Sequence, residues 1–63
     1  MIFITAQQYE NYSYRFFKED DGSFVVRIYD GDKYKKTRTH KSSDEVLLIY
    51  GAHFPKLESF LTS

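Results

Sequence analysis

Four of the nine carboxyl side chains in this chain, a residue type that can do acid–base chemistry, lie within two residues of a glycine. Asp20 and Asp21 precede one glycine, and Asp30 and Asp32 flank another. Paired carboxylates catalyse acid–base reactions when a cleft holds them together. Aspartate beside glycine is also the usual composition of a tight turn, because the carboxylate accepts from local amides and the glycine takes a positive φ. We favour the turn interpretation for both pairs.

A second arrangement, a histidine with two serines, offers nucleophilic chemistry. His40 lies close to Ser42 and Ser43 in the sequence. A serine nucleophile needs a base and a buried acid that orients the base, and no residue is recognisable as that acid. The chain has no cysteine, and His53 has no matching metal ligand close to it in the sequence. We therefore expect no enzymatic activity, no small-molecule substrate, no metal and no cofactor.

Charge and length restrict the remaining classes of function. Nine Lys and Arg residues balance nine Asp and Glu residues, so net charge does not draw the chain to nucleic acid or to a membrane. No apolar run approaches the ~20 residues of a transmembrane helix, and the N-terminus lacks the blocks of a signal peptide. We expect a single domain, residues 1–63, that is complete, soluble and intracellular.

Sequence patterns predict the sheet that would position these side chains. Three segments alternate in polarity or are rich in β-branched residues, which is typical of strands: residues 12–18, 24–29 and 34–40. A three-residue loop between the first two strands would pair Phe16 with Val26 and Tyr14 with Ile28, which buries a coherent apolar face. The third strand is poor in apolar residues and is predicted to be an edge.

The flanking segments are assigned less specifically. Residues 31–32 fit a two-residue hairpin loop. Residues 1–6 form a short apolar run, which is typical of a brief strand or a packed arm, and residues 7–11 are polar and predict a turn.

One helix has both a start signal and a stop signal. The Ser42 hydroxyl can accept from the amide of Glu45, whose carboxylate can reach back to the amide of Ser42, as in a capping box. Gly51 can take the left-handed conformation that ends a helix. We predict a helix over residues 43–50. Beyond it, Pro55 fits the first position of a second short helix, and a terminal strand is the alternative.

The predicted helix is more apolar than one packing face requires. A helix with one buried stripe needs an apolar residue at every third or fourth position, whereas residues 46–50 are four aliphatics and a tyrosine. A small domain without disulfides is often stabilised by oligomerisation. We predict an α+β fold in which one α-helix packs on a small antiparallel β-sheet of three or four strands. Two copies would pair through their helices as a homodimer.

A basic segment over residues 33–41 contains interleaved Tyr and Thr residues, a pattern typical of nucleic-acid binding. In the predicted register, one sheet face carries basic and aromatic side chains together: Arg15, Arg27, Lys36, Arg38, Phe17, Tyr29 and Tyr34. This face resembles that of the small three-stranded arm-binding domains of tyrosine-type phage integrases, in which a sheet enters the major groove of DNA. An edge strand that lysines protect from pairing is the alternative interpretation of the basic segment.

Another pattern runs from the acidic hairpin to the end of the helix. Its residues form an Asp-Asp-Gly turn, a helix cap and a Tyr-Gly helix end: Asp20, Asp21, Gly22, Ser43, Asp44, Tyr50 and Gly51. The pattern resembles the short uracil-DNA glycosylase inhibitor proteins of podophages that infect Bacillus. This chain departs from that family at Val46, where the family has a pocket-lining Phe, and at Arg27, where it has a glutamate. It also has a longer segment between the hairpin and the helix.

The resemblance implies a dimeric phage protein whose paired helices form an apolar groove. The groove takes the leucine that the glycosylase normally pushes into DNA, so the inhibitor acts as a DNA mimic in the DNA-binding cleft of the host enzyme. Our first hypothesis is this inhibition of base excision repair in the host cytoplasm, with host uracil-DNA glycosylase as partner and without direct nucleic-acid binding. The expected partner-binding residues are Glu45, Val46, Leu47, Ile49, Tyr50, Gly51 and His53. Our second hypothesis is a DNA-binding module that uses Arg15, Arg27, Tyr29, Lys36 and Arg38.

Overall fold

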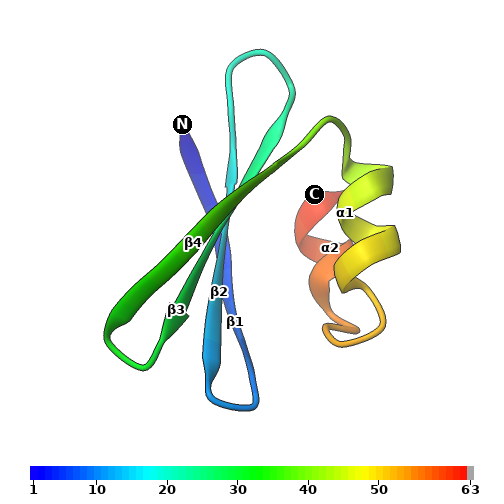
Figure 1. Cartoon of the computed structure of the whole chain (residues 1–63). Coiled ribbons are helices and arrows are strands. Elements are labelled where there is room, and N and C mark those ends of the chain that lie inside the picture. Colours follow the sequence, from blue (N-terminus) through cyan, green and yellow to red (C-terminus); the bar gives the residue numbers. More distant parts are fainter. Residues whose placement is uncertain (63) are drawn as a thin grey trace.

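Two helices cover one face of a four-stranded antiparallel sheet, in an α+β fold (Figure 1). The computed structural model describes residues 1–62. The elements in chain order are β1 (Ile2–Tyr9), β2 (Tyr12–Lys18), β3 (Phe24–Asp30), β4 (Lys33–His40), α1 (Ser43–Tyr50) and α2 (Leu57–Leu61). The fold class is confirmed, with a second helix that the prediction had left open.

The strands follow one another across the sheet in the order β1-β2-β3-β4. The predicted register between β2 and β3 is confirmed, because Phe16 pairs with Val26 and Tyr14 pairs with Ile28. The three-residue loop is closed by the amide of Glu19, which donates to the carbonyl of Ser23 at 2.8 Å. The edge position of β4 is confirmed as well.

The prediction of a turn over residues 7–11 is wrong. Strand β1 continues through Gln7 and Gln8 to Tyr9, and these residues pair with the beginning of β2. The chain reverses at Glu10, which takes a positive φ of 56°. The polar glutamines misled the prediction because β1 is an edge strand, where polar side chains are tolerated.

A β-bulge in β4 changes which residues share a sheet face. Asp30 pairs with Lys33 and Tyr29 with Tyr34, as the two-residue loop predicts, but Ile28 then pairs with Lys36. The register shift leaves Lys35 without a partner residue, and every later residue of β4 moves to the opposite face. The prediction that Lys36 and Arg38 share a face with Arg27 is therefore wrong, since Arg38 pairs with Val26 instead.

Helix α1 begins as predicted and ends differently. The Ser42 hydroxyl accepts from the Glu45 amide at 3.2 Å, but the Glu45 carboxylate bonds His40 at 3.0 Å. Gly51 is right-handed, with φ −60° and ψ −32°, and its amide donates to the Leu47 carbonyl. The prediction of a left-handed Gly51 is wrong. A Cβ at this position would collide with the carbonyl oxygen of Leu47, so glycine is needed for the close approach.

The core lies between the sheet and the two helices. Four of its side chains are almost fully buried: Phe16, Val26, Val46 and Leu57. Each such aliphatic or aromatic side chain contributes ~1.5–3 kcal/mol to folding. Leu57 is the first residue of α2, so Pro55 lies before the helix and not at its first position as predicted. Phe54, between the helices, packs against Tyr14 and Phe16.

Candidate functional site

Within residues 1–62, no helix covers the second face of the sheet (Figure 1). That face carries five residues that we call the arginine–aromatic plate: Arg15, Phe17, Arg27, Tyr29 and Tyr34. Arg15 pairs directly with Arg27 across β2 and β3, and Tyr29 pairs with Tyr34 across β3 and β4. Directly opposed residues of an antiparallel pair point to the same side of the sheet. The plate therefore follows from strand register alone.

The two arginines of the plate lie over aromatic rings. The Arg15 guanidinium carbon is 4.3 Å from the centroid of the Tyr29 ring, and that of Arg27 is 5.0 Å from the Phe17 ring. Tyr29 in turn makes an edge contact with Tyr34, with ring centroids 5.7 Å apart. A cation over a ring is attracted to the π-face with ~0.5–1 kcal/mol at exposed sites. These contacts favour positions of the guanidinium groups over the rings of the plate.

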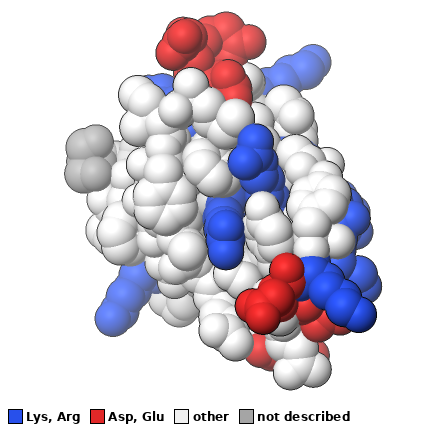
Figure 2. Space-filling model, turned by 90° about the vertical axis from the view of Figure 1, so that its left-hand side faces the viewer, with Lys and Arg blue, Asp and Glu red and all other residues white. Residues whose placement is uncertain are grey.

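The positive charge of the plate is not neutralised within the part of the chain that the structure describes. The one ion pair among residues 1–62 joins His40 and Glu45, so no carboxylate pairs with Arg15 or Arg27. Figure 2 shows this face with basic side chains at its centre, uncharged surface directly around them, and both acidic and further basic side chains towards its margins. The bulge leaves Arg15, Arg27 and Tyr29 of the predicted nucleic-acid-binding set together, and separates them from Lys36 and Arg38.

Lys36 and Arg38 line a groove on the other face, which we call the helix-side groove. It has a volume of about 520 Å³ and lies beside the C-terminal end of α1. Its basic side is formed by Lys35, Lys36 and Arg38 of β4. The remaining lining comes from β2, β3 and the region at the end of α1: Tyr12, Tyr14, Ile28, Ile49, Tyr50 and His53. Sequence reasoning missed Tyr12, Tyr14, Ile28 and Lys35, because the groove depends on the bulge.

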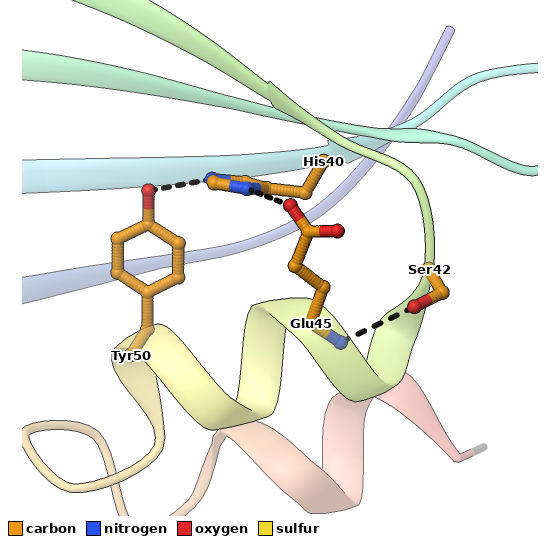
Figure 3. A network of polar contacts seen from close by, with 4 residues as sticks. All are labelled: His40, Ser42, Glu45 and Tyr50. Atoms are coloured by element: carbon orange, nitrogen blue, oxygen red, sulfur yellow. Dashed lines mark hydrogen bonds and ion pairs between the residues drawn. The ribbon is translucent and has the colours of Figure 1, made fainter.

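A buried histidine joins β4 to α1 (Figure 3). His40 is 5% exposed, with Nδ1 3.0 Å from the Glu45 carboxylate and Nε2 2.8 Å from the Tyr50 hydroxyl. The hydrogen bond from His40 is the main reason that the pKa of Glu45 is lowered. Burial raises the pKa of Tyr50, so its hydroxyl stays protonated at neutral pH. Tyr50 is thus a hydrogen-bonding residue of the core rather than an activated nucleophile.

The structure divides the predicted partner-binding residues into inward and outward groups. Val46 is 0% exposed. Glu45 and Tyr50 are bonded to His40, and Leu47 packs partly buried against the core. Ile49 is 45% exposed.

The other residues at this end of the helix are His53, Gly51 and Leu48. His53 is exposed, with its ring 4.2 Å from that of Tyr9, and Gly51 is half-buried. Leu48, which was not in the predicted set, is 84% exposed. The outward face of α1 is therefore formed mainly by Leu48 and Ile49.

Within residues 1–62, no three His, Cys, Asp or Glu side chains gather in a way that could hold a metal ion, and no helix is long and apolar enough to cross a membrane. No protein-family model, curated protein or solved structure matches the chain.

Proposed function

We propose that this protein is a non-enzymatic binding module that holds the phosphate backbone of nucleic acid on its arginine–aromatic plate. One observation carries the proposal: Arg15 and Arg27 lie directly opposite each other on a sheet face that no helix covers, and no carboxylate pairs with either. Like charges directly opposite each other destabilise a sheet. An anion bound between them would remove that repulsion.

The chemistry of the plate suits a phosphate backbone. A guanidinium group presents a planar fork of donors that matches phosphate oxygens, and aromatic rings lie close to the guanidinium groups of Arg15 and Arg27. Tyr34 is 57% exposed at the side of the plate, where a sugar or base can contact its ring. Phosphate contacts position a protein on nucleic acid without reading its sequence, so we expect binding with little sequence preference.

The acidic turns also limit the direction in which a bound phosphate chain can cross the sheet. The turns at the ends of the central strands carry Asp20 and Asp21 at one end and Asp30 and Asp32 at the other. These carboxylates repel a phosphate chain that runs along the strands. A backbone that crosses the strands passes over Arg15 and Arg27 without approaching either acidic turn.

The test is a titration of fluorescein-labelled duplex DNA, followed by fluorescence anisotropy at 25 mM to 200 mM salt. We expect binding that weakens steeply with salt, because phosphate contacts release counterions. Single-stranded DNA of the same length shows whether the duplex is preferred. No anisotropy change at micromolar protein in the lowest salt, with either DNA, would eliminate the proposal.

A second candidate function is inhibition of uracil-DNA glycosylase, and the exposed aliphatic side chains of α1 favour it. Leu48 and Ile49 lie outward on the helix with 84% and 45% of their surface exposed. Adjacent exposed aliphatics are a feature of interaction sites. Because Val46 and Tyr50 are in the core, a groove for the leucine of the enzyme would have to be formed by Leu48 and Ile49 of two copies.

A glycosylase assay on uracil-containing DNA tests this second candidate. We expect inhibition at near-stoichiometric protein, and its loss in Leu48→Asp, which places a charge on the outward helix face. Arg27→Gln is the matched control and keeps full inhibition, because it changes only the plate. Unimpaired uracil excision at a large excess of the wild-type protein would rule inhibition out.

A further inference from the structure

The helix-side groove contains a concentration of positive charge that neither proposed function uses. Lys35, Lys36 and Arg38 lie on its β4 side. These three side chains are exposed, and they form no ion pair with any carboxylate among residues 1–62. None of the described residues that line the groove is acidic. The bulge at Lys35 brings them together, because without it Lys36 would pair opposite Arg27 on the other face.

The opposite side of the groove is aromatic. Tyr12 and Tyr14 are half-buried, Tyr50 is buried, and His53 is exposed at the rim. The Lys35 ammonium lies 5.2 Å from the centroid of the Tyr12 ring, so the cationic and aromatic sides meet there. The positive charge of Arg38 also acts on the Tyr50 hydroxyl and partly offsets the rise in the pKa of Tyr50 that burial causes.

The floor of the groove is preorganised by the core. Ile28 is buried on β3, and the Tyr50 hydroxyl is fixed by its 2.8 Å hydrogen bond to His40. A volume of about 520 Å³ falls within the ~300–1,000 Å³ of small-molecule sites, which combine apolar and aromatic walls with a few polar groups. This lining favours a ligand that has both an aromatic body and an anionic group.

We propose that the helix-side groove binds a mononucleotide, with its phosphate on Lys35, Lys36 and Arg38 and its base against the rings of Tyr12 and His53. Base–aromatic stacking occurs with every base because each has a π-face, so we expect little preference among bases. This proposal does not depend on nucleic-acid binding by the plate, because the two sites lie on opposite faces of the sheet.

The test uses isothermal titration calorimetry with adenosine monophosphate, inorganic phosphate, adenosine and phenyl phosphate as separate ligands. We expect adenosine monophosphate to bind at least tenfold more tightly than phosphate or adenosine alone. Proton NMR should show shifts of the Tyr12 and His53 ring signals and none at Phe17 or Tyr29. Equal affinity for phosphate and for adenosine monophosphate would overturn the aromatic half of the proposal, and equal affinity for phenyl phosphate would overturn the nucleotide assignment.

Charge variants test the phosphate side. Lys36→Gln and Arg38→Gln should each weaken binding of adenosine monophosphate about tenfold, because each removes a charge-assisted contact worth ~1.5 kcal/mol or more. Lys56→Gln, an exposed lysine before α2 that does not line the groove, removes the same charge and should leave the affinity unchanged. A similar loss in all three variants would show non-specific attraction and overturn the site.

Nucleic-acid binding by the plate and mononucleotide binding by the helix-side groove can be overturned independently of each other. Arg27→Gln should weaken binding of duplex DNA and leave binding of adenosine monophosphate unchanged, whereas Lys36→Gln should weaken mononucleotide binding. Absence of any heat or NMR shift at millimolar adenosine monophosphate would overturn the groove site without affecting the plate.

Discussion

His40 links the edge strand of the sheet to helix α1. Both ring nitrogens of this buried histidine are engaged, one with Glu45 and one with Tyr50. Among the described residues, no buried side-chain nitrogen or oxygen lacks a partner. Because a buried polar group without a partner is costly, the network makes the position of α1 dependent on His40.

We predict that His40→Ala lowers the free energy of unfolding by about 1–3 kcal/mol, because the Tyr50 hydroxyl is left buried without its partner. Urea unfolding followed by circular dichroism measures the change. Lys41→Ala, the exposed neighbour, is the control and should stay within about 0.5 kcal/mol of the wild type. If His40→Ala unfolds at the same urea concentration as the wild type, the network does not hold α1.

Acid should weaken the fold through Glu45. Its pKa is lowered from the ordinary 4.5, first of all by the hydrogen bond from His40. A lowered pKa gives stability that is present above pH 4.5 and is lost as the pH falls through the folded-state pKa. We predict that the melting temperature falls below pH 4.5 and that it falls less steeply in Glu45→Gln. Identical pH profiles of the two proteins would contradict this role.

The Asp21 carboxyl should also lose its contribution to stability as the pH falls, because its pKa is lowered too. Hydrogen bonds from the side chain and the backbone of Ser23 lower the pKa of the Asp21 carboxyl. Some acid sensitivity should therefore remain in Glu45→Gln, and the double variant with Asp21→Asn should show the shallowest profile.

At the scale of elements, the bulge in β4 determines which side chains lie on each face of the sheet. An unbroken two-residue hairpin would place Lys36 opposite Arg27, and the bulge instead places Thr37 there. Because the side-chain period of a strand is two residues, the same shift turns His40 towards Tyr50.

We predict that deletion of Lys35 leaves the fold intact, because Lys35 has no partner residue and its removal keeps Lys36 opposite Ile28 and His40 opposite Phe24. Lys35→Ala keeps the bulge and should also fold as the wild type does. Thermal melts followed by circular dichroism measure the stability of both variants. A deletion variant that unfolds would show that the bulge itself, and not only the pairing of β4 with β3, is needed to hold His40 against α1.

The sequence was sufficient to predict the elements that have strong local signals. The β2–β3 register followed from the requirement that Phe16 and Val26 share an apolar face, and the start of α1 followed from Ser42. The bulge was not predictable, because β4 has almost no apolar side chains whose burial could fix its register. The conformation of Gly51 was missed because a glycine after a helix satisfies both a left-handed end and a close backbone approach.

At the scale of the whole molecule, the candidate site was predictable only where it depended on the β2–β3 register. Arg15, Arg27 and Tyr29 were placed together correctly, whereas Lys36 and Arg38 belong to the helix-side groove. Val46 and Tyr50 were expected to contact a partner, but both are buried in the core. The sequence could not show which side of an apolar helix faces the sheet.

The outward face of α1 leads to a prediction about assembly. If two copies pair through their helices, Leu48 and Ile49 form the contact, since they are the exposed aliphatics of α1. We expect sedimentation equilibrium at micromolar concentration to give a dimer for the wild type and a monomer for Leu48→Asp. A wild-type protein that remains monomeric throughout this range would contradict the paired-helix arrangement.

The salt dependence of duplex DNA binding tests the central claim most directly. The double variant Arg15→Gln/Arg27→Gln is compared with Lys18→Gln/Lys56→Gln, which removes the same charge outside the plate. For two lost phosphate contacts, the slope of log affinity against log salt should become shallower by about 1.8 in the plate variant. The control should keep the wild-type slope. Equal slopes for the wild type and both variants would contradict a phosphate-binding role for the plate.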